Sequence, residues 1–519
     1  MQDETSDPAD RTRSIGGRVA TGGMWAFGGR GASLIAVLVA TPFTIRLLGP
    51  SRYGLLALLQ SALTWAILTD LGMGTASTKL ATEEYAEGDS RGESSVVWTA
   101  LAITVGTTAC AAAGAGIAAP VIVTDLLHVQ GSLYGPGVVA LRIACALLLV
   151  QVFIGTINTP QLVRLRWGGY TLVTQGVSVL QVVGIPIGLA VASGGVVTAA
   201  WVTLAAALIG ALATLLLSAR SQPSLFRSGP QRRWVRPLLA YGGALSVAGI
   251  AAIPLSTAER FFLAHYRSTA SVAYYAVAMS LGTILAEVPY ALIAPLMPGL
   301  VHLEASGQLD ERRALYTKAL QGLFLTCAPA ALLLAFVAQP FLSVWAGPAY
   351  GQHGTGPFIV ILAGELFLSL GYVPNSYLLA AGRTKLLALI DVSEVGPYLV
   401  MAALITARWG AVGAAAVWSA RVIVSTLLYF GAAKRAGLGC SPLSGRRFAS
   451  AASPLVFGAV LLLLALDFHG LPVRTVWAAV LGLAYGLVVW HWVLTAAERA
   501  GLSAMVVEVL PWLTKWQRH

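Results

Sequence analysis

Long apolar stretches separated by short polar turns recur along nearly the whole of this 519-residue chain. A stretch of about 20 apolar residues can cross the hydrocarbon core of a membrane as a helix, and a helix satisfies its own backbone hydrogen bonds there. The pattern therefore predicts an all-α, polytopic membrane protein with about fourteen transmembrane helices. The predicted helices are 20–47, 53–80, 94–119, 137–163, 170–192, 195–218, 238–265, 271–302, 316–345, 356–381, 385–407, 410–434, 448–467 and 474–496.

Lysine and arginine are unevenly divided among the turns between these helices. Alternate segments are basic, among them the N-terminal tail, 164–166, 219–237 and 434–447. Because short cytoplasmic loops carry the excess of positive charge, we expect these segments, and both chain termini, on the cytoplasmic side of the membrane. The alternation also favours an even number of helices.

The longest basic stretch divides the chain into two halves of six helices. A shift of 221 residues superposes Tyr53 on Tyr274 and Asp89 on Asp310, which indicates an internal repeat. Paired halves of this kind are common in transporters, with the substrate handled between them. We expect an unstructured cytoplasmic tail (1–19), a first lobe (20–218), a basic linker (219–237), a second lobe (238–435), two further helices (436–496) and an amphipathic cytoplasmic tail (497–519).

Composition excludes several classes of protein. Hydrophobic residues make up 57% of the chain and charged residues only 11%, whereas soluble domains carry about a quarter charged residues. The net charge of +11 falls at helix ends without a continuous basic face, so we expect no nucleic-acid partner. The sequence contains no GxSxG, HExxH or Walker-type loop, no metal-ligand cysteine pair and no large outer loop. We therefore predict neither an enzyme nor a cofactor-binding or metal-binding protein.

Four arginines lie within predicted transmembrane helices: Arg30, Arg142, Arg260 and Arg421. A charge at the centre of a bilayer costs about 3 kcal/mol on insertion scales, so such residues usually face protein or a water-filled cavity. Guanidinium groups remain charged when buried and match phosphate oxygens in geometry. These arginines are therefore candidates for binding an anionic substrate. Each could instead pair with a nearby acid and lock helices together, and Arg142 could extend to the outer interface.

Six acids also fall within the predicted helices: Asp70, Glu259, Glu287, Glu365, Asp391 and Glu394. Asp391 and Glu394 are three residues apart and share one helix face. A nearby second carboxylate favours sharing of a proton, so these acids are candidates for H⁺ or Na⁺ coupling or for gating. Pairing with the arginines is the alternative.

The segment from Ala40 to Asp89 contains two recognisable motifs. Arg46 to Gly54 reads RLLGPSRYG, and Asp70 to Gly74 reads DLGMG. Both resemble the "LGP-x-x-YG" turn and the "DLG-x-G" element of the polysaccharide-biosynthesis flippases, which belong to the multidrug/oligosaccharidyl-lipid/polysaccharide exporter superfamily. Glu83 to Asp89, in the following loop, is also similar to that family.

This resemblance implies a V-shaped pair of lobes that alternates between inward-open and outward-open states in the bacterial cytoplasmic membrane. The implied substrate is an undecaprenyl-diphosphate-linked oligosaccharide, and the implied partners are membrane lipids and the polysaccharide assembly machinery. A cation-coupled small-molecule antiporter of the same superfamily is the alternative, and a membrane-embedded enzyme of glycan assembly is a third interpretation.

Overall fold

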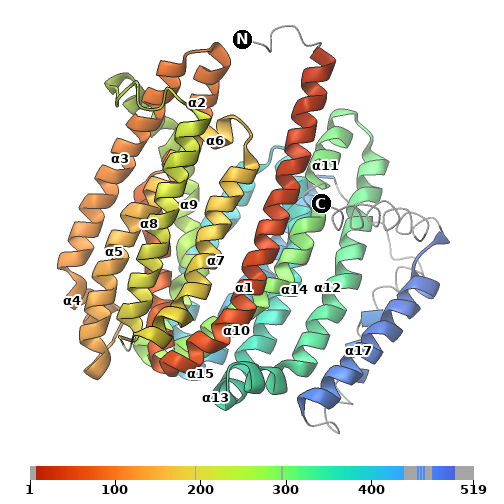
Figure 1. The fold of residues 1–519 in the computed structure, drawn as a ribbon. Helices are drawn as coiled ribbons and strands as arrows, with labels where there is room; N and C mark the ends of the chain where they lie inside the picture. The colour runs from red at the N-terminus through yellow and green to blue at the C-terminus, as the bar shows by residue number, and fades with distance from the viewer. Residues whose placement is uncertain are drawn as a thin grey trace, which may run out of the picture. The chain divides into compact units, whose positions relative to one another are not determined.

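The computed structural model describes residues 8–192, 194–293, 296–437, 453–454, 456–458, 460–461, 470–496 and 499. Every regular element in this part of the chain is a helix (Figure 1). The residues form two compact units. Unit 1 contains the chain up to Val277 together with Asp391–Trp418, and unit 2 contains Ala278–Ile390 and the chain from Ser419 onward.

The chain enters unit 1 through a long helix with a sharp bend. Helix α1 runs over Pro8–Trp65, and Gly49 inside it has φ 72° and ψ 168°. Glycine adopts positive φ without strain, and the following Pro50 disfavours helical geometry at residue 49. The bend therefore separates the first two predicted helices at the predicted turn. The tail expected to be unstructured is helical from Pro8, a residue whose fixed φ suits the first turn of a helix.

The second predicted helix is interrupted at the DLGMG motif. The 3₁₀ helix η1 covers Ala66–Asp70, and α2 begins only at Met73 and ends at Glu87. Leu71 and Gly72 between them both adopt the left-handed conformation. A Cβ atom on Gly72 would lie 2.6 Å from the Gly242 carbonyl oxygen. The motif therefore combines a backbone turn with close approach of another helix.

The remaining helices of unit 1 pack around several apolar clusters. They are α3 (Ser90–Ile117), α4 (Ala119–Val121), η2 (Ile122–Leu126), η3 (Gly131–Leu133), α5 (Tyr134–Ile157), α6 (Thr159–Val163), α7 (Trp167–Val191), α8 (Val196–Ser221), α9 (Arg232–Tyr266) and the first part of α10 (Thr269–Ile293). Met73 of α2 packs with Val97 of α3 and Leu238 of α9. Ile143 of α5 packs with Leu204 and Ala207 of α8.

Unit 2 is built in the same way from longer helices. It contains the rest of α10, α11 (Leu296–Ala305), α12 (Leu309–Trp345), α13 (Pro348–His353), α14 (Thr355–Ala380), both ends of α15 (Thr384–Arg435), α17 (Leu471–Val488) and the π-helix η4 (Val489–Val493). Leu300, Leu323 and Tyr377 lie in its main apolar cluster. Phe336 of α12 packs against Trp477 and Tyr485 of α17 in a smaller one.

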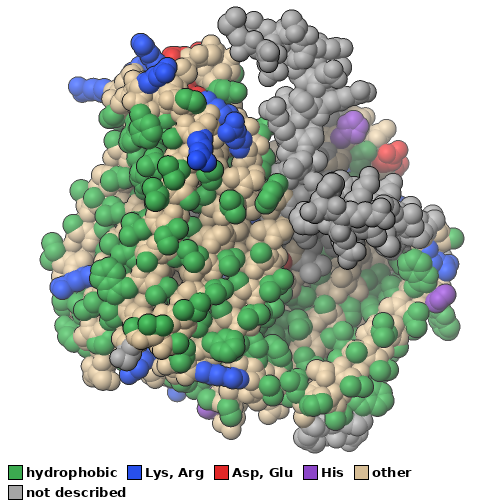
Figure 2. Space-filling view, in the orientation of Figure 1, with side chains coloured by type: hydrophobic (Ala, Val, Ile, Leu, Met, Phe, Trp, Pro, Cys, Tyr) green, Lys and Arg blue, Asp and Glu red, His purple; other side chains and the backbone are tan. Residues whose placement is uncertain are grey.

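The outer surface is apolar to a degree that a water-soluble protein does not show. Leu172, Trp201 and Leu483 are among many large exposed hydrophobic side chains, and α17 has no buried residue at all. Figure 2 shows hydrophobic side chains spread over α3, α5 and α8, with Lys and Arg gathered near α2 and α6. Ten of the described helical segments are long and apolar enough to cross a membrane. An outer surface this apolar is stable only in contact with lipid. The chain is therefore a multi-pass membrane protein.

The predicted helices and the observed ones correspond closely, with local differences. The fourth, 137–163, is divided at Asn158 into α5 and α6, and the eleventh and twelfth are joined as α15 with a bend at Gly410. The thirteenth, 448–467, and the amphipathic tail lie largely outside the described residues. The proposed lobe boundary at 219–237 stays a prediction.

Candidate functional site

Glu259 is the centre of a polar cluster inside unit 1. Its side chain is 0% exposed on α9. The Tyr275 hydroxyl donates a hydrogen bond of 3.0 Å to one carboxylate oxygen, and the Tyr398 hydroxyl donates one of 2.5 Å to the other. A buried charge is stable only when it is paired and hydrogen-bonded. The two tyrosines therefore stabilise Glu259 and tie α9 to α10 and α15.

Arg260, the next residue, faces a different neighbour. Its Nη1 donates a hydrogen bond of 2.9 Å to the Ser61 hydroxyl of α1. Its Nε lies 3.9 Å from the nearer Glu259 oxygen, which is too far for a hydrogen bond. No described residue accepts a hydrogen bond from that Nε–H. The side chain as a whole is 20% exposed, although the Nε atom itself is buried, and the bond to Ser61 fixes the position of the guanidinium.

The end of α1 is attached to α9 beside this cluster. The Trp65 indole N–H donates a hydrogen bond of 2.9 Å to the Thr257 hydroxyl, and the Trp65 ring meets Phe261 edge-to-face at 6.1 Å between centroids. Tyr53, from the first sequence motif, is also close enough to Arg260 for an electrostatic interaction. These contacts hold Ser61 in place to accept from Arg260.

The other arginines predicted for the site have different surroundings. Arg142 is exposed on α5 and donates to the Gly116 carbonyl oxygen at 3.2 Å. Gly116 lies in the last turn of α3, where basic side chains commonly satisfy unpaired carbonyls. Arg30 is exposed on α1, where the neighbouring Ser33 hydroxyl bonds the Gln175 side chain of α7. Arg421 is partly buried on α15 in unit 2.

Unit 2 also contains a fully buried glutamate, Glu365, whose environment differs from that of Glu259. Its side chain on α14 is also 0% exposed, yet neither carboxyl oxygen has a hydrogen-bond partner among the described residues. Gly282 of α10 packs against this position, since a Cβ there would lie 3.7 Å from Glu365 Cγ. The Glu287 carboxyl, also on α10, interacts with it electrostatically. Two acids thus lie close enough to interact inside unit 2.

Asp70, Asp391 and Glu394 are the remaining acids of the predicted set. Asp70 accepts a long hydrogen bond of 3.5 Å from the Gly74 backbone N–H, so it caps the start of α2. Asp391 and Glu394 lie on the part of α15 that belongs to unit 1, with Glu394 buried and Asp391 partly buried.

Sequence reasoning missed a buried ion pair and the partners of Glu259. Arg164, expected in an exposed cytoplasmic loop, donates from Nη2 to the buried Glu93 at 2.9 Å and lies over the Tyr85 ring. Tyr275 and Tyr398 were also missed, although each is a polar aromatic residue inside an apolar run. Among the described residues, no three His, Cys, Asp or Glu side chains lie close enough to hold a metal ion.

Comparison with known protein families identifies the family of this chain. The family model for "Polysaccharide biosynthesis protein" matches residues 19–301, which is more than half of the chain. The chain belongs to the polysaccharide biosynthesis protein family. The match covers both sequence motifs, Glu259, Arg260 and Tyr275, and all of α2 to α10, whereas Tyr398 lies outside it.

One relative of this polysaccharide biosynthesis protein is named as a transporter. A putative O-antigen transporter of Shigella flexneri is 28% identical over 191 residues, which are 37% of this chain and 45% of that protein. The chain thus matches less than half of the length of that relative.

Two solved structures show the fold. The lipid II flippase MurJ in an inward closed conformation is similar with a TM-score of 0.71 at 12% identity, over 89% of this chain and 98% of that one. An inward-facing multidrug resistance MATE family transporter of the MOP superfamily is similar with a TM-score of 0.66 at 13% identity, over 78% and 94%. This member of the family therefore has the MOP-superfamily fold, and the resemblance inferred from the motifs is confirmed.

Proposed function

We propose that this protein is a flippase that moves an undecaprenyl-diphosphate-linked oligosaccharide from the inner to the outer leaflet of the bacterial cytoplasmic membrane. It works by alternating access and serves cell-surface polysaccharide biosynthesis, with both termini in the cytoplasm. The observation that carries the proposal is Arg260. Its guanidinium lies on α9, a helix that the sequence predicts to cross the membrane, and is held there by Ser61, with an N–H that no described residue uses, in a chain of this family.

Arg260 has the chemistry that a diphosphate requires. A guanidinium offers five donors in a planar fork and remains charged in an apolar environment. Hydrogen bonds to phosphate from such a group are about twice as strong as neutral ones. Arg421 and Arg30 are the further candidates for this role, whereas the bond from Arg142 to the end of α3 supports a structural role.

Energy for the movement can come from the membrane potential and from a proton or sodium gradient. Each elementary charge gains about 2.3 kcal/mol per 100 mV, so a diphosphate leaving a negative interior is driven outward. We assign proton coupling to Glu365, because an ionised carboxylate without partners is too costly to bury. Glu287, Asp70, Asp391 and Glu394 stay candidates for coupling, and Glu259 for gating.

The second candidate function is a cation-coupled small-molecule antiporter. The observation that favours it is the closeness of Glu287 and Glu365 in unit 2, because two acids in an apolar region suit a cationic substrate. A transport assay in proteoliposomes separates this candidate from the flippase.

The test is flipping of a fluorescent undecaprenyl-diphosphate-linked sugar by the full chain in proteoliposomes, detected by chemical quenching of the outer leaflet. We expect Arg260→Gln to lower the rate at least about tenfold, since a charge-assisted hydrogen bond contributes about 1.5–3 kcal/mol. Arg142→Gln is the matched control and should stay within about twofold. Glu365→Gln should remove the response to an imposed pH gradient.

Two results would overturn the proposal. Equal losses in Arg260→Gln and Arg142→Gln, with both variants folded, would show that Arg260 has no special role. Failure of the wild-type chain to flip the lipid, together with proton-driven export of a small organic cation, would favour the antiporter.

A further inference from the structure

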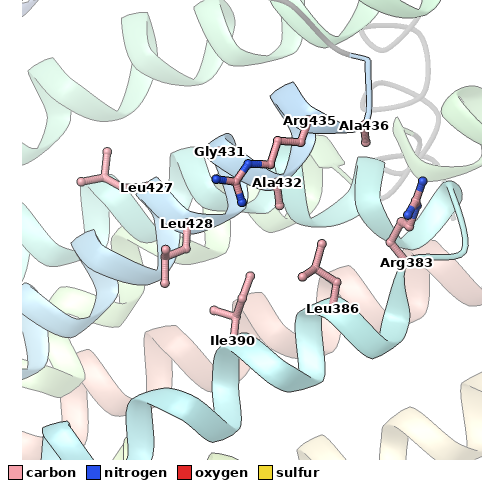
Figure 3. A pocket seen from close by; sticks show the side chains of 9 residues that line it. All are labelled: Arg383, Leu386, Ile390, Leu427, Leu428, Gly431, Ala432, Arg435 and Ala436. Atoms are coloured by element: carbon pink, nitrogen blue, oxygen red, sulfur yellow. The ribbon is translucent and has the colours of Figure 1, made fainter.

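Unit 2 contains a cavity of about 470 Å³ that the proposed transport function does not use (Figure 3). It lies between the two ends of α15, which are brought together because the helix bends at Gly410. Two arginines and a set of apolar side chains form its wall. The lining includes Arg383, Arg435, Leu386, Ile390, Leu427 and Leu428.

The two arginines of this cavity have no hydrogen-bond or ion-pair partner among the described residues. Arg383 immediately precedes α15 and Arg435 is its last residue. Neither guanidinium makes an ion pair or a hydrogen bond with any residue that the structure describes, and no carboxylate lines the cavity. Figure 3 shows the Arg435 side chain extending back along its helix toward Gly431 and Ala432. The lining of the cavity therefore carries two positive charges and no carboxylate.

The apolar residues that line the cavity are suited to contact with hydrocarbon chains. Leu386 and Ile390 extend from one end of α15 toward Leu427 and Leu428 on the other (Figure 3). Leu427 and Leu428 are 58% and 43% exposed, in a protein whose outer surface faces lipid. Basic pockets between transmembrane helices near the cytoplasmic surface bind anionic lipid headgroups, and Arg383 lies in a loop predicted to be cytoplasmic.

We propose that this cavity between the ends of α15 binds an anionic glycerophospholipid of the inner leaflet, with its phosphate at Arg383 and Arg435 and its acyl chains along the four apolar residues. Phosphate is the shared chemistry, and the occupant is a resident membrane lipid rather than free phosphate or the transported cargo. The proposal does not depend on the flippase function, because it requires only a bilayer that contains such a lipid.

The test is native mass spectrometry of the delipidated full chain titrated with phosphatidylglycerol. A basic residue near a membrane surface contributes roughly 1 kcal/mol to binding an anionic lipid, so we expect Arg383→Gln and Arg435→Gln each to weaken binding about fivefold. Lys434→Gln is the matched control, because Lys434 is a neighbouring exposed cation that does not line the cavity. It should leave the affinity unchanged.

A second variant tests the cavity rather than the charge. A Cβ on Gly431 would meet nothing within 4 Å, so Gly431→Leu adds a side chain to the cavity lining without a clash at Cβ and keeps both arginines. We expect it to weaken phosphatidylglycerol binding at least as much as either arginine variant. Gly322→Leu on α12, a position that is equally open, should have no effect.

Several outcomes would overturn the proposal. Arg435→Gln behaving like Lys434→Gln would show that Arg435 only complements the helix dipole. Equal affinity for phosphatidylethanolamine would show that the headgroup is not recognised. Competition by millimolar inorganic phosphate would assign the site to a free anion, and strong preference for undecaprenyl phosphate would assign it to the cargo.

Discussion

Two glutamates of this protein are equally buried but have opposite environments. Glu259 in unit 1 and Glu365 in unit 2 both have side chains that are 0% exposed. Glu259 accepts hydrogen bonds from two tyrosines and has Arg260 at 3.9 Å. Glu365 has no hydrogen-bond partner among the described residues and interacts with a second acid.

The difference shows that burial alone does not define the role of an acid in a membrane protein. A carboxylate whose oxygens are both satisfied stabilises the helices that hold it, and removing it leaves its partners unsatisfied. A carboxyl group without partners contributes little to stability. The free-energy cost of ionising it depends strongly on its surroundings. We therefore assign structure to Glu259 and exchange of a proton to Glu365.

The largest expected effect separates the two glutamates directly. Glu259→Leu should destabilise the protein by about 3–5 kcal/mol, because it removes the carboxylate that accepts from two buried hydroxyl groups and lies 3.9 Å from the Arg260 guanidinium. Glu365→Leu should change stability by less than about 1 kcal/mol or increase it. The measurement is unfolding in mixed micelles monitored by tryptophan fluorescence. Similar losses in both variants would show that the contrast between the two sites is wrong.

A smaller effect is expected from the two phenols. Tyr275→Phe and Tyr398→Phe should each cost about 1–2 kcal/mol, since each removes one hydrogen bond to a buried charge. Combined with Glu259→Gln in double-mutant cycles, both should show coupling energies well above zero in the same unfolding measurement. Tyr134→Phe, at an exposed tyrosine on α5, is a control of the same chemistry. Additive effects for either pair would contradict the assigned hydrogen bond.

The smallest effect concerns an acid outside the membrane. The Gly92 backbone N–H, with that of Arg91 and the nearby Arg233 charge, holds the pKa of Asp89 below its usual range. A depressed pKa in the folded state adds stability above the unfolded-state pKa, and this stability is lost as pH falls through the folded-state value. Asp89→Asn should therefore lower the melting temperature by no more than about 2 °C at neutral pH, with no difference at strongly acidic pH. A difference that persists in acid would contradict the charge-based account.

Much of the fold could be predicted from the sequence because each spanning helix carries its own signal. The apolar runs, the turn at Gly49 and the break before the helix at Ser90 were all predicted within a few residues. The interruption at Leu71 and Gly72 was not, although the DLGMG motif marked the place. Its cause is the close approach of Gly242 from α9, and local periodicity does not contain that contact.

The candidate site could be predicted only in part. The charged residues inside apolar runs were identifiable, because the cost of burying charge makes each of them conspicuous. Their partners were not, since Ser61 is 199 residues from Arg260 and Tyr398 is 139 residues from Glu259. Arg142 and Arg260 looked alike in sequence, yet one is bonded to the end of a helix on the surface and the other is held between α9 and α1.

The sequence by itself determined that this chain crosses the membrane many times and carries charge within those crossings. This is so because a membrane-spanning helix must contain its own apolar length and its own hydrogen bonds. Tertiary structure decided which of those charges are satisfied. Hydrogen bonds act only over about 3 Å, and packing alone brings two phenols to Glu259 while leaving Glu365 against apolar atoms and another acid.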